Sequence, residues 1–118
     1  MYKLFFGLLV LIGSLLLATG CTKRYKRTVK VCDGNLFVEI YNFNPAGVDA
    51  DYLTDSTSFR LYVGQFDNEH ENFRYTCNGD TVTIQKIEYV YQKNKSSRVL
   101  STRRLSISEI KKNKSFDF

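Results

Sequence analysis

The 118-residue sequence predicts an all-β protein, a small antiparallel β-sandwich or barrel of about seven strands behind a cleaved signal peptide. Apolar and polar residues alternate over most of the chain, which is the pattern of half-buried strands. Two dipeptides, Asp33-Gly34 and Asn78-Gly79, are strong signals for tight hairpin turns. Beyond the signal peptide, no long stretch shows the apolar spacing of an amphipathic helix.

The first 20 residues are organised like a signal peptide. Lys3 supplies a positive charge, and residues 4–17 are apolar except for two glycines and a serine. This run is shorter than the stretch of about 20 apolar residues that a membrane-spanning helix needs. Small residues then lead to Cys21, so we expect residues 1–20 to be removed.

The segment Leu17-Ala18-Thr19-Gly20-Cys21 resembles the lipobox of bacterial lipoproteins, with Ala18 where that motif usually has leucine. The resemblance covers residues 1–21 and implies that Cys21 becomes an N-terminus carrying a diacylglycerol and a further acyl chain such as palmitate. It also implies a lipid-anchored place in the bacterial cell envelope. Because Thr22 and not aspartate follows Cys21, the expected membrane is the outer one, facing the periplasm. The alternative is an ordinary cleaved signal with Cys21 as an incidental thiol.

Charge is distributed unevenly along the rest of the chain. Residues 21–118 carry 16 Lys and Arg against 12 Asp and Glu, a net charge of +4. The segment 33–80 is acidic, and the segments on both sides of it are basic. We expect residues 21–27 to form a lipidated basic tether that contacts anionic headgroups or is simply solvated. An exported protein rarely meets nucleic acid, so no nucleic-acid partner is expected.

The two other cysteines, Cys32 and Cys77, predict a disulfide, because export places them in an oxidising compartment. We expect one domain at residues 28–110 and a basic tail at 111–118. Val29 and Val31 alternate into the Asp33-Gly34 turn, which would pair Val31 with Leu36 and Val29 with Val38. In that register, Cys32 faces away from the side of the hairpin that carries the valines, which makes its pairing with Cys77 difficult.

The later elements follow the same logic. Residues 42–58 are expected to be a loop, with a helical turn between Asp49 and Asp55. Strands are expected from residue 59 and from residue 73, and the turn at Asn78-Gly79 would pair Tyr75 with Val82. A change of apolar phase predicts a bulge near Gln85-Lys86. A last strand at 99–107 precedes a short basic helix or a frayed tail.

Catalysis and metal binding have little support. Asp49, Asp51 and Asp55 are weak candidates for a metal site, because Leu53 and Thr54 break the EF-hand pattern. Helix capping and solubility are the roles that we expect for them. His70, flanked by Glu69 and Glu71, is the only histidine, and it stands in a charged loop where solvation is its expected role. We expect no enzyme activity, no metal and no cofactor.

The aromatic residues are the best candidates for a binding surface. Tyr62, Tyr89 and Tyr91 lie in predicted strands among polar neighbours, and exposed tyrosines make good contact surfaces. The alternative is that they complete a thin core. The sequence therefore favours a non-catalytic envelope lipoprotein, a binding or accessory subunit that contacts another envelope protein. The sequence indicates no particular small-molecule ligand.

Two other functions stay open. The first hairpin, Val31-Cys32-Asp33-Gly34 followed by Phe37-Val38, is similar to that of the membrane-bound inhibitors of C-type lysozyme. This resemblance implies a lipoprotein inhibitor of lysozyme or of another secreted hydrolase. The inhibitory Ser-Gly-x-x-Tyr loop of that family has its nearest counterpart at residues 57–62, where the glycine is missing. A cell-wall glycan-binding module is the other alternative.

Overall fold

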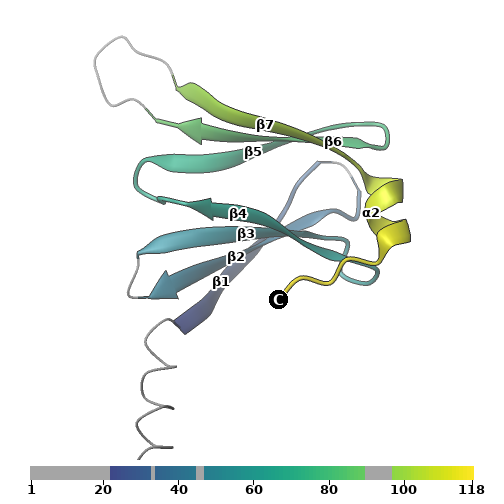
Figure 1. The fold of residues 1–118 in the computed structure, drawn as a ribbon, viewed down its shortest axis with the longest axis horizontal. Coiled ribbons are helices and arrows are strands. Elements are labelled where there is room, and N and C mark those ends of the chain that lie inside the picture. Colours follow the sequence, from purple (N-terminus) through teal and green to yellow (C-terminus); the bar gives the residue numbers. More distant parts are fainter. Residues whose placement is uncertain (1–21, 33, 45–46, 90–96) are drawn as a thin grey trace, which may run out of the picture.

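Two antiparallel sheets form the protein in the computed structural model, which describes residues 22–32, 34–44, 47–89 and 97–118 (Figure 1). The larger sheet has the order β1-β2-β3-β4 and the smaller one β5-β6-β7. The strands are β1 (Thr22–Lys30), β2 (Phe37–Asn44), β3 (Val48–Thr54), β4 (Arg60–Phe66), β5 (Glu71–Asn78), β6 (Thr81–Glu88) and β7 (Arg98–Ser106), and the helix is α2 (Ile107–Asn113). The predicted all-β sandwich is confirmed. Residues 1–21, with Cys21, and Tyr91 lie outside the described residues.

The first hairpin has the predicted register. Val29 lies opposite Val38, and the Val31 N–H donates to the Leu36 carbonyl at 3.0 Å. The strand ends before Cys32, whose φ of 60° takes it out of the extended conformation. The alternation of faces along β1 therefore does not extend to Cys32.

The prediction of a loop over residues 42–58 is wrong. β2 continues to Asn44, and β3 (Val48–Thr54) is an interior strand, paired with β2 on one side and β4 on the other. The strand was not recognised because it contains Asp49 and Asp51. Carboxylates are rarely buried, yet both of these side chains are buried. Both face the second sheet, where side chains from distant parts of the chain contact them.

The expectation of a tether at residues 21–27 is also wrong for residues 22–27. They belong to β1, which pairs with the extended β2 from Thr22 opposite Asn44 onward. Nearly every residue of β1 is exposed. Its polar composition is that of a solvated edge strand, which sequence patterns do not distinguish from a tether.

The second hairpin is shifted by two residues from the predicted register. Tyr75 lies opposite Ile84, because the turn consists of Gly79 and Asp80, with Gly79 at a φ of 60°. A shift of two residues keeps the same side chains on the same face. A register shift lies near the predicted bulge, between Lys86 and Ile87 in the pairing with β7, but the extra residue is Leu100 of β7. β6 itself is one continuous strand that pairs with β5 without a shift.

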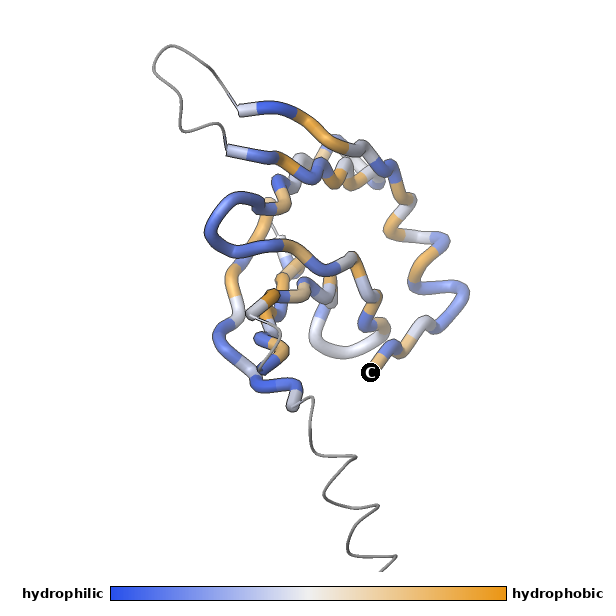
Figure 2. Tube along the Cα trace, turned by 60° about the vertical axis from the view of Figure 1, so that its left-hand side comes forward, coloured by the Kyte–Doolittle hydropathy of each residue, from blue (hydrophilic) through white to orange (hydrophobic). Residues whose placement is uncertain are grey.

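The core lies between the two sheets. In Figure 2, hydrophobic and hydrophilic residues alternate along the strands, whereas the β4–β5 loop and the exposed side of α2 are hydrophilic. The helix, one of the two alternatives predicted for this segment, buries Ile110 against the core. Its start is held by Asp80, which accepts hydrogen bonds from the Ser106 and Ser108 hydroxyls at 2.6 and 2.7 Å. The buried hydrophobic residues of the core cluster are Leu36, Val38, Ile40, Leu53, Phe59, Phe66, Val82, Ile84 and Ile110.

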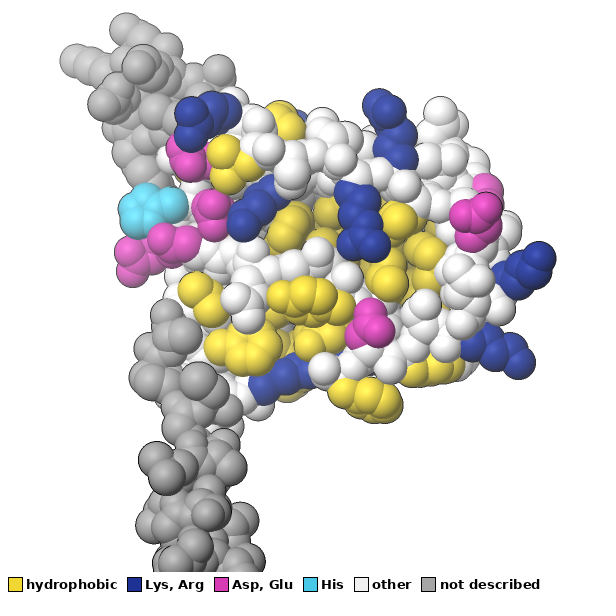
Figure 3. Space-filling view, viewed as in Figure 1, with side chains coloured by type: hydrophobic (Ala, Val, Ile, Leu, Met, Phe, Trp, Pro, Cys, Tyr) yellow, Lys and Arg dark blue, Asp and Glu magenta, His cyan; other side chains and the backbone are white. Residues whose placement is uncertain are grey.

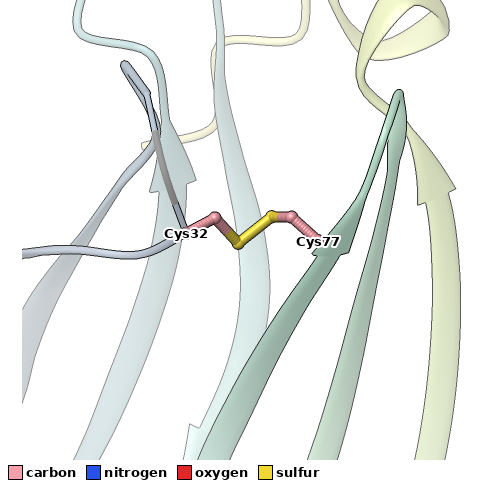
Figure 4. The surroundings of a disulfide bond; sticks show 2 residues. All are labelled: Cys32 and Cys77. Carbon is pink, nitrogen blue, oxygen red and sulfur yellow. A yellow bond between two sulfur atoms is a disulfide. The ribbon is translucent and has the colours of Figure 1, made fainter.

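A disulfide joins Cys32 to Cys77 and links the two sheets (Figure 4). The Cα atoms are 5.7 Å apart. The positive φ of Cys32 removes the difficulty that strand alternation predicted, because the side chain leaves the hairpin where the strand has already ended. The predicted pairing is therefore confirmed.

The last residues return to the larger sheet. The Arg60 N–H donates to the Ser115 carbonyl, and the Asp117 N–H donates to the Arg60 carbonyl, both at 2.7 Å. Phe116 thus forms a parallel bridge with Arg60 along the free edge of β4. The C-terminal segment 115–118 covers an edge that would otherwise offer unpaired backbone groups.

Candidate functional site

Four tyrosines cross the outer face of the larger sheet in a row, one from each strand. The rings of Tyr25 and Tyr41 have centroids 5.6 Å apart, and Tyr41–Tyr52 and Tyr52–Tyr62 follow at 5.3 Å each. Every contact is edge-to-face, the arrangement that the charge distribution of aromatic rings favours. The row follows from register, since Tyr25 lies opposite Tyr41, and Tyr52 opposite Tyr62. We call these four residues the tyrosine row.

Two cations cover the middle of the tyrosine row. The Lys23 ammonium lies 4.4 and 4.3 Å from the ring centroids of Tyr41 and Tyr52, and the Arg60 guanidinium lies 5.0 and 3.9 Å from the same two rings. Arg60 also donates from Nε to Glu39 at 2.7 Å. The middle rings are thus occupied by the protein's own side chains.

The two ends of the row remain accessible. Tyr25 is 58% exposed and Tyr62 is 37% exposed. Tyr62 borders a groove of about 650 Å³, which Phe43 and Gln65 line from the sheet and Phe116, Asp117 and Phe118 from the C-terminal segment. The Tyr62 N–H donates to the Asp117 carboxylate at 2.8 Å, which holds that segment beside the row. This end combines exposed aromatic rings with a few polar groups.

The other predicted surface tyrosine lies elsewhere. Tyr89 is 42% exposed and lines a separate cavity of about 290 Å³, together with polar residues that include Lys26, Arg27 and Asp49. That cavity opens on the side of the sheet opposite the tyrosine row. The structure therefore does not join Tyr62 and Tyr89 into one surface.

Asp49 and Asp51 are buried between the sheets, so the expected solubility role is wrong for them. Asp49 accepts hydrogen bonds from Lys26 and Asn42, both at 2.8 Å. Burial alone would raise the pKa of Asp49, but these hydrogen bonds outweigh it and hold the pKa below its ordinary value. Asp49 is a buried carboxylate kept charged by its partners.

The pKa of Asp51 is shifted in the opposite direction. It accepts a hydrogen bond from the Tyr75 hydroxyl at 2.6 Å, while its Oδ1 atom has no partner among the described residues. Burial raises the pKa of Asp51 to about 6, with the nearby charge of Asp49 adding to the shift. Burial also raises the pKa of Tyr75, which stays a donor.

Asp55 is a loop-forming residue and does not share a site with the other two carboxylates. Its side chain accepts from the backbone N–H groups of Thr57, Ser58 and Phe59 at 3.0, 2.7 and 3.2 Å. Burial opposes ionisation, yet these bonds and the Ser58 hydroxyl lower the pKa of Asp55 to about 2. This is a capping role like the one expected, in a loop instead of a helix. Phe59 is buried in the core and residues 60–62 belong to β4, so residues 57–62 do not form a protruding loop.

His70 lies in an acidic loop at one end of the molecule, where acidic side chains gather around the histidine in Figure 3. Its Nδ1 lies 2.8 Å from the Asp67 carboxylate, which raises the pKa of His70. Ligand atoms of Asp67, Glu69 and His70 lie within 4.8 Å of one another. The His70 and Asp67 side chains are about half exposed, and exposed acidic groups of this kind are common without a metal ion.

Sequence reasoning identified Tyr62 but missed Tyr25, Tyr41 and Tyr52. The missed tyrosines belong to β1, β2 and β3, two of which had been interpreted as a tether and a loop. A usable signal existed in residues 48–54, where Val48, Ala50 and Tyr52 alternate with carboxylates. Treating those carboxylates as the buried face would have placed Tyr52 beside Tyr62.

Within the described part of the chain, no helix combines the length and the apolar character needed to cross a bilayer. The chain matches no protein family, no curated protein and no solved structure in the comparisons made.

Proposed function

We propose that this chain is a non-catalytic lipoprotein of the bacterial cell envelope, a membrane-anchored binding or accessory subunit. Its acylated N-terminus at Cys21 holds it on the outer membrane, facing the periplasm. The tyrosine row contacts another envelope protein. The lipobox-like segment at residues 17–21 supports the anchor, and the row supports the contact.

The observation that carries the binding role is the exposed Tyr62 end of the tyrosine row, which borders the aromatic groove. Tyrosine is enriched at protein interfaces because its rigid ring buries a large area while its hydroxyl still bonds. Lys23 and Arg60 hold the two middle rings, and the Tyr62 ring packs edge-to-face on Tyr52, so the Tyr62 side chain has less freedom to lose on binding. Such a platform suits a protein partner.

The covered middle of the row argues against flat stacking of a sugar ring. Tyr41 and Tyr52 already carry cations close to their ring faces. A partner that brings its own apolar side chains to Tyr62 and the groove fits this surface better. Anchoring on a common membrane raises the effective concentration of both partners, so a small contact area suffices.

A lipoprotein inhibitor of a secreted hydrolase is the alternative, favoured by one observation. Asp67 and Glu69 lie close together in the β4–β5 loop, and an acidic surface complements a basic enzyme such as lysozyme. An inhibition assay with lysozyme tests this alternative. Charge reversal at Glu69 would relieve an inhibition that uses this loop.

The binding role is tested by photo-cross-linking in intact cells. A benzophenone amino acid replaces Tyr62 in one strain and Tyr89 in another, two tyrosines of similar exposure on different faces. We expect a discrete cross-linked product with one envelope protein from position 62 and none from position 89.

The identity of the cross-linked protein is then checked with Tyr62→Ser, which should weaken co-purification of that protein from solubilised membranes. Equal cross-linking from both positions would indicate non-specific encounters. The absence of products at position 62, in cells where the chain is present and acylated, would contradict the proposed surface.

A further inference from the structure

The strand β1 begins at Thr22, directly after the proposed lipid site at Cys21. A strand advances about 3.3 Å per residue, so the residues up to Arg27 lie within about 20 Å of the acyl chains. No flexible tether separates the folded domain from the membrane. The first residues of β1 therefore lie within reach of the bilayer surface.

Five of the nine residues of β1 are basic and none is acidic (Lys23, Arg24, Lys26, Arg27 and Lys30). Lys26 pairs with Asp49, and Lys23 lies over the tyrosine row. Arg24 and Lys30 are exposed and form no ion pair with any described residue. Two cations of β1 are thus available to an external anion.

The other residues of β1 also suit a membrane interface. It forms the edge of the larger sheet, and Tyr25 and Val29 are its exposed apolar side chains. Tyrosine together with lysine and arginine is the composition that proteins place at the boundary between headgroups and water. Basic residues also protect sheet edges from pairing, and β7 is a second basic edge strand that serves as a comparison.

We propose that β1 lies against the anionic headgroups of the membrane that holds Cys21, with Arg24 and Lys30 contacting lipid phosphates. This inference rests on the lipid anchor of the proposed function and adds a fixed orientation to it. The Tyr25 end of the tyrosine row is then at the membrane. Tyr62, three strands away, stands about 14 Å further out, where a partner reaches it.

The test uses the acylated chain purified from membranes and reconstituted into vesicles of phosphatidylcholine, with or without phosphatidylglycerol. Hydrogen exchange is measured on peptides that cover residues 22–30. We expect exchange to be several-fold slower on the anionic vesicles. The difference should disappear near 1 M salt, where charges are screened over about 3 Å.

Two double variants with the same charge change test whether the lipid-dependent slowing is specific to β1 or common to basic edge strands. Arg24→Glu with Lys30→Glu should abolish the lipid-dependent slowing, whereas Arg103→Glu with Arg104→Glu on β7 should leave it intact. Equal exchange on both kinds of vesicle overturns the inference. So does an equal effect of the two double variants.

Mass spectrometry of residue 21 distinguishes a chain that lacks the lipid anchor from a chain whose β1 does not contact headgroups. If Cys21 carries no lipid, the same chain is sedimented with the two kinds of vesicle. Sedimentation with anionic vesicles alone, lost in the β1 double variant, would still support a headgroup contact of β1. Absence of sedimentation would overturn it.

Discussion

Asp51 and Asp55 show at the scale of single residues how the same side chain responds to opposite surroundings. Asp51 is 2% exposed, with the Tyr75 hydroxyl as its hydrogen-bond donor and the charges of Asp49 and Arg27 nearby. Asp55 accepts bonds from three successive backbone N–H groups. Burial raises the pKa of Asp51, whereas hydrogen bonds to the charged carboxylate lower the pKa of Asp55.

We predict that Asp51→Asn removes a loss of stability that the native protein shows as pH rises. The pKa of Asp51 is raised from 3.8 to about 6 in the folded state, so both states bind the proton below pH 3.8. Between pH 3.8 and about pH 6, only the folded state keeps the proton on Asp51. The free energy of unfolding therefore falls by an amount on the order of 3 kcal/mol as pH rises through this window. Denaturant titrations at several pH values measure the difference between variant and native protein.

Asp55→Asn is the matched variant with the opposite sign. The pKa of Asp55 is lowered from 3.8 to about 2, so its contribution is present above pH 3.8 and is lost as pH falls toward 2. At neutral pH, the variant should lose about 2 kcal/mol of unfolding free energy. If the stability of Asp51→Asn depended on pH in the same way as that of the native protein, the pKa of Asp51 would not be raised in the folded state.

At the scale of elements, strand positions and registers were predicted best where residues close in sequence determine them. The register of the first hairpin follows from apolar alternation and turn residues close in sequence, and the β6–β7 register shift lies near the place where the apolar phase changes. β3 alternates as well, but its buried carboxylates resemble loop residues, because the side chains that match them, Lys26 and Tyr75, lie 23 and 24 residues away. The tyrosine row was hidden for the same reason, since it needs all four strands of the sheet.

Arg60 connects three elements on the outer face, and we predict that Arg60→Met destabilises the fold by about 2 kcal/mol. Its guanidinium bonds Glu39 of β2 and the Asp117 carbonyl of the C-terminal segment, and lies 3.9 Å from the Tyr52 ring of β3. The Arg60 side chain is only 16% exposed, so little water replaces these contacts. Urea unfolding measures the loss.

Arg98→Met is the control for this prediction. Arg98 also pairs with a glutamate, Glu88 at 2.9 Å, but its side chain is 66% exposed. Exposed ion pairs contribute between zero and about 1 kcal/mol, so this variant should be close to the native protein. Equal losses in the two variants would mean that Arg60 acts as an ordinary surface cation.

At the scale of the whole molecule, the two sheets share a small core. Its buried hydrophobic side chains come from β2, β3, β4 and β6, together with the connecting segments and α2. A domain of this size buries a modest fraction of its surface, so a covalent link between the sheets has a large effect on the free energy of unfolding. The sequence predicted this link from the compartment and from the even number of cysteines left after Cys21, without any knowledge of the geometry.

We therefore predict that Cys32→Ala with Cys77→Ala lowers the free energy of unfolding by about 4 kcal/mol, the chain-entropy value for a loop of this length. The cysteines are 45 residues apart in sequence and lie on different sheets, so the unlinked chain gains freedom over much of the domain. Denaturant titration of the double variant, the oxidised native chain and the reduced native chain measures the effect. The reduced chain should match the double variant, because the Cα atoms at 5.7 Å need no distortion to form the bond. A double variant as stable as the oxidised protein would show that contacts between the sheets suffice without the cross-link.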